Sequence, residues 1–454
     1  MSIIALIPGV LCLIAMLRGR TQLALRCVVL PSMLLLPDYY FWIQRPFPSI
    51  NFVDSALLVL GAGMLLTDMP RWKFTRTDLW MAVFLFTTCY TDYNHERTTD
   101  AAFALFASIT VGLIPYMAGK LLIEQTGSRI SVSKMIVLLL SWSSFVSATE
   151  YFTKVNPYNE FWRHLFPGQW TIWKTQIRWG FGRVAGPFAQ SELAGMMLFT
   201  ALLLALWLGR SNYQELASHP PPPTLLQRGK AHIWILAVAL FLTQARGPWI
   251  GAVLALAIAP IGNAKRPLRR AIIVFTCIVL IGVPTYLFGK DYLAGPRVNS
   301  GSEKETAQYR AELISNYTPV AILGGEWGWG AGFPRINGQD SIDNEYLYAW
   351  LVQGYVGAVA FLLIVGDTII TLIIKGAKAN TVRDRHFALT MLGIFIGIAF
   401  TLTTVFLGSQ SYELFFLLVG WSQAIREPRA QTSEIRNDEI YRLESDSSVA
   451  GVYT

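Results

Sequence analysis

The sequence predicts an all-α fold: a polytopic transmembrane helix bundle of about 12–14 helices, with two long loops on its outer side that contain short helices. Three observations support this fold class. The 454 residues are 53% hydrophobic but only 15% charged, whereas soluble domains carry roughly 25% charged residues. Thirteen apolar runs follow one another along the chain. Basic residues cluster between alternate runs, as expected when a chain crosses a bilayer repeatedly.

The apolar runs carry the prediction of the individual helices. A membrane-spanning helix needs about 20 mostly apolar residues. We divide 232–245 from 247–262, instead of joining them in one long helix, because Arg246-Gly247-Pro248 interrupts the pattern and proline breaks helices. The predicted spans are 3–17, 22–43, 52–69, 79–94, 101–123, 132–151, 188–209, 232–245, 247–262, 271–289, 343–374, 387–406 and 412–424.

The distribution of positive charge predicts the orientation. The basic residues Arg18 and Arg20 follow the first apolar run, whereas a cleavable signal peptide has them before it. We therefore expect a retained first helix whose N-terminus lies outside. Lys and Arg gather in cytoplasmic loops. With this orientation, 24 of the 37 basic residues fall in inward segments, each of which holds at least three, and the C-terminus is cytoplasmic.

Ten of the remaining 13 basic residues lie in two long outward loops. Long loops are free to violate the charge rule, yet cations placed there suit an anionic ligand. In the second loop, 302–316 has helical spacing and predicts a short helix on the outer surface. The predicted regions are the N-terminal transmembrane helices 1–151, the first long loop 152–187, the central transmembrane helices 188–289, the second long loop 290–342, the C-terminal transmembrane helices 343–424 and a disordered cytoplasmic tail 425–454.

Charge and cysteine content exclude two other classes of protein. The net charge of +8 would suit a nucleic-acid-binding protein, but topology explains the inward positive charge, so no nucleic acid is expected as a partner. The four cysteines lie in or beside apolar runs. No disulfide framework is therefore predicted.

Three polar stretches at the predicted outer face hold the residue types that chemistry would need. The first leads into a helix, the second is a turn between two helices, and the third crosses the second long loop and enters the next helix. Their sequences are RWGFGRVAGPFAQSELA (178–194), LTQARGPWIG (242–251), and YR (309–310) followed by WGWGAGF (327–333), DNEYL (343–347) and QGYVG (353–357).

Together these stretches resemble the O-antigen ligase and Wzy-type polymerase family, which are GT-C-like membrane glycosyltransferases. Members of that family show an Arg-x-x-Gly-x-Phe stretch before a helix, a Thr-x-Ser-Arg-Gly-x-Trp-like turn, and Gly-x-Gly then His-Asn-x-Tyr-Leu before a Gly-hydrophobic-Gly helix. All three patterns occur here in the same order between about 175 and 365. The flanking helices agree only in hydropathy.

The resemblance implies a multi-pass enzyme of the bacterial inner membrane with a periplasmic N-terminus and two periplasmic loops. Such enzymes polymerise or ligate undecaprenyl-diphosphate-linked oligosaccharide repeat units for exopolysaccharide, capsule or O-antigen. The partners implied are this glycan donor, a glycan acceptor, membrane lipids, a flippase and a chain-length regulator. The sequence names neither the sugar nor the linkage.

Arginines of this chain match the cation positions of the family. The resemblance implies that Arg183 and Arg246 bind the diphosphate and that Arg310 is a third contact, with Arg178 as an alternative to Arg183. Guanidinium groups match phosphate oxygens bidentately, and a cation aimed at developing charge is worth about 2–4 kcal/mol. We therefore expect neither metal nor cofactor. Arg183 could instead be an interfacial anchor, and Glu192 is predicted to pair with an arginine near the site.

A general base is expected at the start of the helix predicted at 343–374. Many members of the family have His before Asn-x-Tyr-Leu, whereas this chain has Asp343. A carboxylate accepts a hydroxyl proton as well as an imidazole does, so Asp343 or Glu345 is the candidate base, with Asn344 and Tyr346 as substrate-binding residues. The alternative is that both acidic residues cap the helix. The departure from His favours a polymerase over a ligase.

The same stretches are rich in aromatic residues. Trp179, Trp249, Trp327 and Trp329 are predicted to bind substrate by stacking on sugar faces. Tryptophan is also enriched in the interfacial belts of membrane proteins, which is the alternative interpretation of each of these four residues.

Other interpretations stay open at this point. Asp340, Asp343 and Glu345 would together suit a divalent cation, although the outward loops hold no clear Asp-x-Asp pair. A lipid-linked oligosaccharide flippase or another transporter also needs many helices, but its polar groups should lie near mid-membrane, often in repeated halves. Here the ionisable groups crowd one face. A peptidoglycan-type polymerase is a third candidate, whose motifs we do not find.

Overall fold

The computed structural model describes residues 2–18, 20–43, 48–169, 174–215, 223–293, 302–339 and 341–425. In these ranges the chain is an all-α polytopic transmembrane bundle with two short antiparallel hairpins, β1 (Phe41–Trp42) with β2 (Ile50–Asn51) and β3 (Ile177–Arg178) with β4 (Phe181–Gly182). The α-helices are α1 (Ile7–Arg18), α2 (Thr21–Ala24), α3 (Leu30–Leu35), α4 (Phe52–Thr67), α5 (Arg76–Asn94), α6 (Thr98–Ala107), α7 (Ile114–Leu122), α8 (Arg129–Thr153), α9 (Pro157–Leu165), α10 (Ser191–Glu215), α11 (Pro223–Leu242), α12 (Arg246–Ile258), α13 (Pro267–Leu293), α14 (Ser302–Leu323), α15 (Glu345–Ala377), α16 (Val382–Thr401) and α17 (Ser409–Ala424). Short 3-10 or π segments are η1 (Ser2–Leu6), η2 (Leu25–Val29), η3 (Met69–Arg71), η4 (Ser108–Leu113), η5 (Ala259–Asn263) and η6 (Gly330–Gly332).

Each of the thirteen predicted apolar runs is helical over most of its length. The prediction at 22–43 extends too far, because Leu36 is extended and a residue before proline avoids helical backbone. Among the described helices, four more are apolar but shorter than the six that are long and apolar enough to cross a membrane. Those six are Thr98–Leu122, Arg129–Thr153, Ser191–Arg210, Pro267–Gly289, Glu345–Ala377 and Val382–Thr401.

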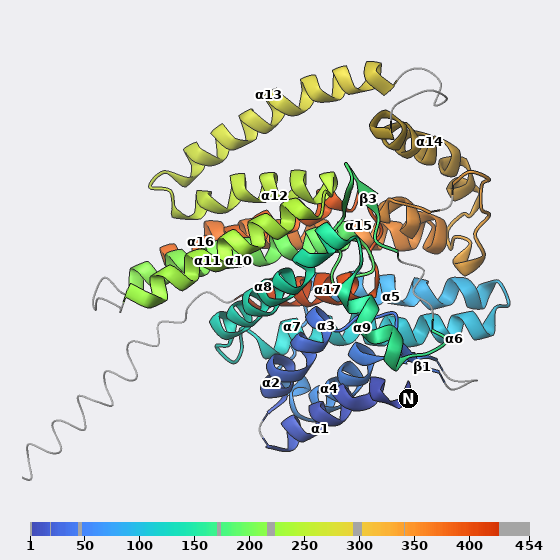
Figure 1. Cartoon of the computed structure of the whole chain (residues 1–454), viewed down its shortest axis with the longest axis horizontal. Helices are drawn as coiled ribbons and strands as arrows, with labels where there is room; N and C mark the ends of the chain where they lie inside the picture. The colour runs from blue at the N-terminus through green and yellow to red at the C-terminus, as the bar shows by residue number, and fades with distance from the viewer. Residues whose placement is uncertain are drawn as a thin grey trace, which may run out of the picture.

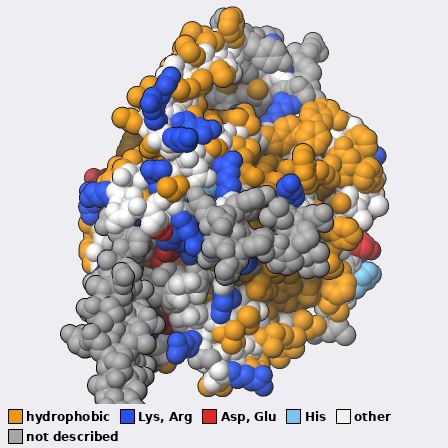
Figure 2. Space-filling model, turned by 90° about the vertical axis from the view of Figure 1, so that its left-hand side faces the viewer, with side chains coloured by type: hydrophobic (Ala, Val, Ile, Leu, Met, Phe, Trp, Pro, Cys, Tyr) orange, Lys and Arg blue, Asp and Glu red, His pale blue; other side chains and the backbone are white. Residues whose placement is uncertain are grey.

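Most helices run along one axis, which is horizontal in Figure 1, so their connections gather at two ends of the bundle. The β3–β4 hairpin and α14 lie at one end, on the right, which we call the long-loop end. The α7–α8 connection lies at the other, which we call the opposite end. Figure 2 shows this opposite end, where Lys and Arg side chains gather. The tail 425–454, predicted to be disordered, lies outside the described residues beyond Ile425.

The second long loop contains the predicted outer helix, which is longer than expected. The prediction covers 302–316, whereas α14 continues to Leu323. One face of α14 packs on the start of α15, through Leu313, Tyr317 and Ala321 against Ile342, Leu347 and Leu351. Arg310 lies one and two helical turns before Leu313 and Tyr317, on the same face. The packing of α14 therefore directs Arg310 toward the bundle.

A break in α15 anchors the end of this loop. Gly354 interrupts the helix with φ of +66°, a conformation that glycine adopts without a steric penalty. The backbone N–H of Trp329 donates to the carbonyl of Leu351 at 2.9 Å, and that of Tyr355 to the carbonyl of Gly325 at 3.2 Å. The segment 325–329 thus occupies the break and holds the loop against α15.

Close contact between α12 and α16 fixes the beginning of α12. A Cβ atom on either Gly251 or Gly397 would lie 2.6 Å from the carbonyl oxygen of the other. Small residues of this kind let helix backbones approach closely within a membrane. Because α12 begins at Arg246, this contact determines where Arg246 stands beside the α16–α17 connection.

Candidate active site

Four arginines from three parts of the chain line one small cavity at the long-loop end. Arg178 and Arg183 belong to the β3–β4 hairpin and the residue after it, Arg246 begins α12, and Arg310 lies on α14. The volume is about 50 Å³, which holds on the order of four water molecules and so matches one phosphate-sized group. We call it the arginine cavity. Its remaining lining residues are Glu192, Gly247 and Ala307.

The β3–β4 hairpin sets the position of Arg178. The pairing of the two strands leaves Trp179 and Gly180 as a two-residue turn, and their φ values of +52° and +80° fit the type I′ turn that suits such hairpins. Nη1 of Arg178 donates to the carbonyl oxygen of Gln244 at 2.6 Å. Trp179 occupies the tip of the hairpin, where its side chain is exposed.

Arg183 is buried, and all its guanidinium nitrogens have acceptors. Nε donates to the carbonyl oxygen of Thr243 at 3.2 Å, Nη2 donates to Oε1 of Glu192 at 2.6 Å, and Nη1 donates to Oε1 of Gln176. An interfacial anchor would instead extend its head toward water. The predicted pairing of Glu192 with an arginine is present in this ion pair.

The turn before α12 joins the second motif to the first. Gln244 has φ of +50°, which is uncommon for a residue other than glycine. In this conformation the carbonyls of Thr243 and Gln244 accept from Arg183 and Arg178. Arg246 follows as the first residue of α12, and the amino end of a helix carries partial positive charge. The arginine side chains and the amino end of α12 therefore both contribute positive electrostatic potential to the cavity.

Arg310 contributes a donor that the protein leaves unsatisfied. Nη2 donates to the carbonyl oxygen of Thr404 at 3.3 Å, while Nε is buried without a hydrogen-bond partner in the described structure. Burial lowers the pKa of Arg310, and burial with repulsion from Arg183 and Arg246 lowers the pKa of Arg178. Arginine stays protonated in proteins. A bound anion would satisfy the free donor and offset the repulsion.

A larger cavity of about 540 Å³ shares Glu192 with the arginine cavity. This volume lies within the usual 300–1,000 Å³ of small-molecule sites. Aromatic faces alternate with amide, hydroxyl and charged groups around it, which is a lining suited to sugars. We call it the Asp343 cavity. Its principal lining side chains are Gln176, Gln190, Glu192, Tyr317, Phe333, Arg335, Gln339, Ser341, Asp343, Tyr348, Thr404 and Phe406.

The two candidate bases have different surroundings although they are two residues apart. Asp343 lines the larger cavity, and its Oδ1 accepts a hydrogen bond from the Ser341 hydroxyl at 2.6 Å. Burial raises the pKa of Asp343, and the Ser341 hydrogen bond opposes that shift. Glu345 is fully buried. Its Oε2 accepts from the backbone N–H of Leu407 at 2.7 Å and its Oε1 from the Tyr412 hydroxyl, and it lines neither cavity.

Asn344 and Tyr346, which flank Glu345, stabilise the local fold. Asn344 precedes α15, and its Oδ1 accepts from the backbone N–H of Leu347 at 3.1 Å, which is an N-cap. The Tyr346 hydroxyl donates to the carbonyl oxygen of Ala399 on α16 at 2.9 Å. Neither side chain lines the two cavities.

Three of the four tryptophans predicted to bind substrate instead make hydrogen bonds or ring contacts within the protein. Nε1 of Trp249 donates to the carbonyl of Leu240, and Nε1 of Trp329 to that of Val320, each at 2.8 Å. Trp327 packs edge-on against Tyr90 with ring centroids 4.6 Å apart. Neither cavity is lined by these rings. The aromatic faces available to a sugar are those of other residues.

Sequence reasoning missed most of the Asp343 cavity. Tyr317 had a usable signal, because it lies two helical turns after Arg310. Thr404 and Phe406 had none, since they fall in the apolar run 387–406 that was predicted as one helix. The structure ends α16 at Thr401 and uses the following residues as a connection that lines the cavity.

The acidic residues considered for a divalent cation lie only partly within the described structure. Asp340 lies outside the described residues. Within the described part of the chain, no three His, Cys, Asp or Glu side chains are placed to hold a metal ion. Asp343 and Glu345 also have separate hydrogen-bond partners.

A comparison with protein families matches one part of the chain. The family model for O-Antigen ligase matches residues 231–362, which include Arg246, Arg310 and Asp343 but begin after Arg183. A comparison with curated proteins gives no match. The matched range lies inside the segment where the sequence motifs suggested the resemblance. The match agrees with that resemblance, and the chain is a membrane protein whose residues 231–362 are similar to the O-Antigen ligase family.

Proposed function

We propose that the protein is a glycosyltransferase that takes a glycan from a lipid diphosphate and joins it to a sugar hydroxyl, as a polymerase or ligase of undecaprenyl-diphosphate-linked repeat units. One observation carries the proposal: a cavity lined by four arginines shares Glu192 with a sugar-sized cavity that contains Asp343. The anion-binding arginines and the candidate base Asp343 thus lie in neighbouring cavities, and Glu192 lines both of them.

The arginine cavity suits the phosphate next to the glycosidic bond. Its size matches one phosphate group, and within the described part of the chain the buried Nε of Arg310 has no hydrogen-bond acceptor. As the glycosidic bond breaks, negative charge grows on the departing diphosphate. Arg183 is held by three acceptors, so it needs no reorganisation when this charge appears. Fixed donors of this kind are worth about 2–4 kcal/mol each in the transition state.

The Asp343 cavity suits the acceptor sugar. In the proposed step the acceptor hydroxyl oxygen forms a bond to the anomeric carbon of the donor, and the bond from that carbon to the diphosphate oxygen breaks. The bonding electron pair leaves with the diphosphate, and the hydroxyl proton passes to the carboxylate of Asp343. The bond with Ser341 orients this carboxylate. A base positioned in this way contributes typically 10²–10⁴-fold to a rate.

The orientation belongs to the same proposal. We place the long-loop end in the periplasm and the opposite end in the cytoplasm of a bacterial inner membrane. The gathering of Lys and Arg at the opposite end supports this placement, because cytoplasmic loops are enriched in these residues.

The test uses the purified full-length protein in vesicles with undecaprenyl-diphosphate-linked repeat units. Growth of the glycan chain would identify a polymerase, and transfer to a second added acceptor would identify a ligase. Movement of the donor across the bilayer without a new glycosidic bond would contradict the proposal and identify a flippase. Arg163→Ala is a matched control for replacing any arginine of the arginine cavity, since Arg163 pairs with Glu160 on the exposed surface of α9.

A further inference from the structure

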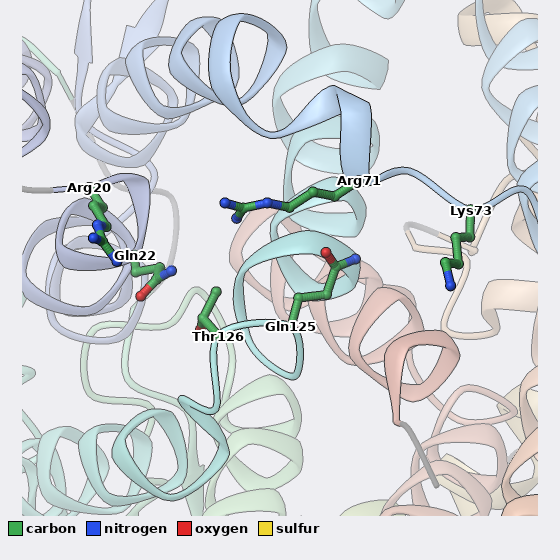
Figure 3. A pocket seen from close by; sticks show the side chains of 6 residues that line it. All are labelled: Arg20, Gln22, Arg71, Lys73, Gln125 and Thr126. Carbon is green, nitrogen blue, oxygen red and sulfur yellow. The ribbon is translucent and has the colours of Figure 1, made fainter. Parts of the chain in front are cut away.

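A second basic cavity lies far from the arginine cavity, among the connections at the opposite end. Its volume is about 520 Å³. In Figure 3 Arg71 extends toward Arg20 and Gln22, with Gln125 and Thr126 on the neighbouring connection and Lys73 on the other side. The lining comes from the start of α2, from η3 and the residues after it, and from the α7–α8 connection. The six side chains are Arg20, Gln22, Arg71, Lys73, Gln125 and Thr126.

The lining supplies cations, amides and a hydroxyl but no carboxylate. Arg71 donates from Nη1 to Asp68 at 2.9 Å, and its side chain remains 53% exposed. Of the three cations, it is the one with an ion pair in the part of the chain that the structure describes. The charge rule of membrane proteins explains why basic residues lie at this end. The rule does not explain why basic side chains from separate segments line the same cavity.

Apolar side chains adjoin this hollow in the sequence and are exposed. Leu17 is 79% exposed near the end of α1, Leu66 is 85% exposed near the end of α4, and Phe74 is 73% exposed directly after Lys73. In a transmembrane bundle such residues contact lipid chains. A cationic cavity whose lining residues are followed or preceded in the sequence by exposed apolar side chains fits a molecule with an anionic head and an apolar tail.

We propose that this cavity binds the phosphate head group of an anionic phospholipid, whose acyl chains lie against Leu17, Leu66 and Phe74. Basic pockets between transmembrane helices bind anionic head groups, and guanidinium groups match phosphate oxygens. Free phosphate has the same charge chemistry but gains nothing from the apolar side chains. The site shares no lining residue with the arginine cavity.

The first test titrates the purified full-length protein in detergent micelles with fluorescent phosphatidylglycerol. Replacing Arg20, Arg71 and Lys73 together by Gln is expected to weaken binding at least tenfold. The matched control replaces Arg266, Arg269 and Arg270 by Gln, which removes the same charge from exposed positions just before α13 and in its first turn, and is expected to change binding less than twofold. Equal weakening in both variants would show attraction to surface charge alone and overturn the site.

Two further measurements complete the test. Gln22→Trp adds bulk to the cavity wall without changing its charge and is expected to weaken binding severalfold. Unchanged binding, in a variant that thermal unfolding shows to be folded, would overturn the site. Competition separates the ligand sources. Short-chain phosphatidylglycerol is expected to displace the probe at least tenfold more effectively than inorganic phosphate or phosphatidylcholine. Equal displacement by inorganic phosphate would overturn the lipid assignment.

Discussion

Arginines gather at both ends of the bundle, but the arginines compared here differ in burial and in hydrogen bonding. At the long-loop end Arg183 is buried, bonded to three acceptors and paired with Glu192. At the opposite end Arg20 and Arg71 are exposed. Topology alone explains an exposed cation on the cytoplasmic side, whereas bringing a cation into the interior is costly unless it is paired. Burial is not the whole difference, because Lys120 on α7 is also buried and paired with Asp78. The long-loop end differs in that four arginines line one cavity.

The largest effect is expected from removing the buried arginine. Arg183→Ala should lower kcat/KM for glycan transfer by about a thousandfold, because a fixed donor to the departing diphosphate is lost. It should also lower the free energy of unfolding by about 3 kcal/mol, because Glu192, whose side chain is only 17% exposed, loses its partner. The measurements are vesicle transfer and thermal unfolding.

A paired variant separates the two effects of Arg183. Changing Arg183 and Glu192 together to Met removes both charges and should recover much of the stability, since buried ion pairs are often replaceable by apolar residues. Transfer should stay at the level of Arg183→Ala. Recovery of transfer together with stability would assign Arg183 to folding only.

The next effect concerns the carboxylate of Asp343. Asp343→Asn should lower kcat by about 10²–10⁴-fold, as expected for a lost general base, with little change in KM for the lipid-linked donor. Glu160→Gln on α9 is the control, because Glu160 is a surface carboxylate at the same end. A kcat within twofold of the unchanged protein would remove Asp343 from the mechanism.

A smaller effect is expected at Arg310. Arg310→Gln should lower kcat/KM by about 10–100-fold, in line with hydrogen bonds to charged groups worth 1.5–3 kcal/mol. The change should fall mainly on donor KM, since Nη2 of Arg310 donates to the carbonyl oxygen of Thr404 while its Nε is buried without a hydrogen-bond partner among the described residues. The control is Arg163→Ala, for which a change in kcat/KM of at most twofold is expected. Equal losses in the two variants would contradict a specific role.

The smallest effect concerns pH. A general base must be deprotonated, so transfer is present above the pKa of Asp343 and is lost as pH falls through it. Burial raises that pKa, and the Ser341 hydrogen bond lowers it. Ser341→Ala should therefore move the acidic limb of the kcat profile to higher pH. Ser315→Ala, which removes an exposed hydroxyl bonded within α14, should leave the limb in place; a shift to lower pH at Ser341→Ala would contradict the assignment.

Much of the architecture could be predicted from the sequence. Apolar length and charge placement depend on local composition, and they located the thirteen helices. The arginines of the first two motifs were also identified, because a charged residue beside an apolar run is conspicuous. Asp343 and Glu345 could not be separated, since both begin the same helix. Their difference depends on Leu407 and Tyr412, which lie more than 60 residues away.

The sequence by itself determined that the chain crosses a membrane, where its helices lie and which cations are candidates for an anion site. These properties follow from side-chain solvation, which each residue carries wherever it packs. The tertiary structure alone decided that four of the arginines share one cavity, that Asp343 opens to a larger one, and that Trp249 and Trp329 bond to backbone carbonyls. A cavity exists only between surfaces that distant segments bring together, so no local pattern can specify it.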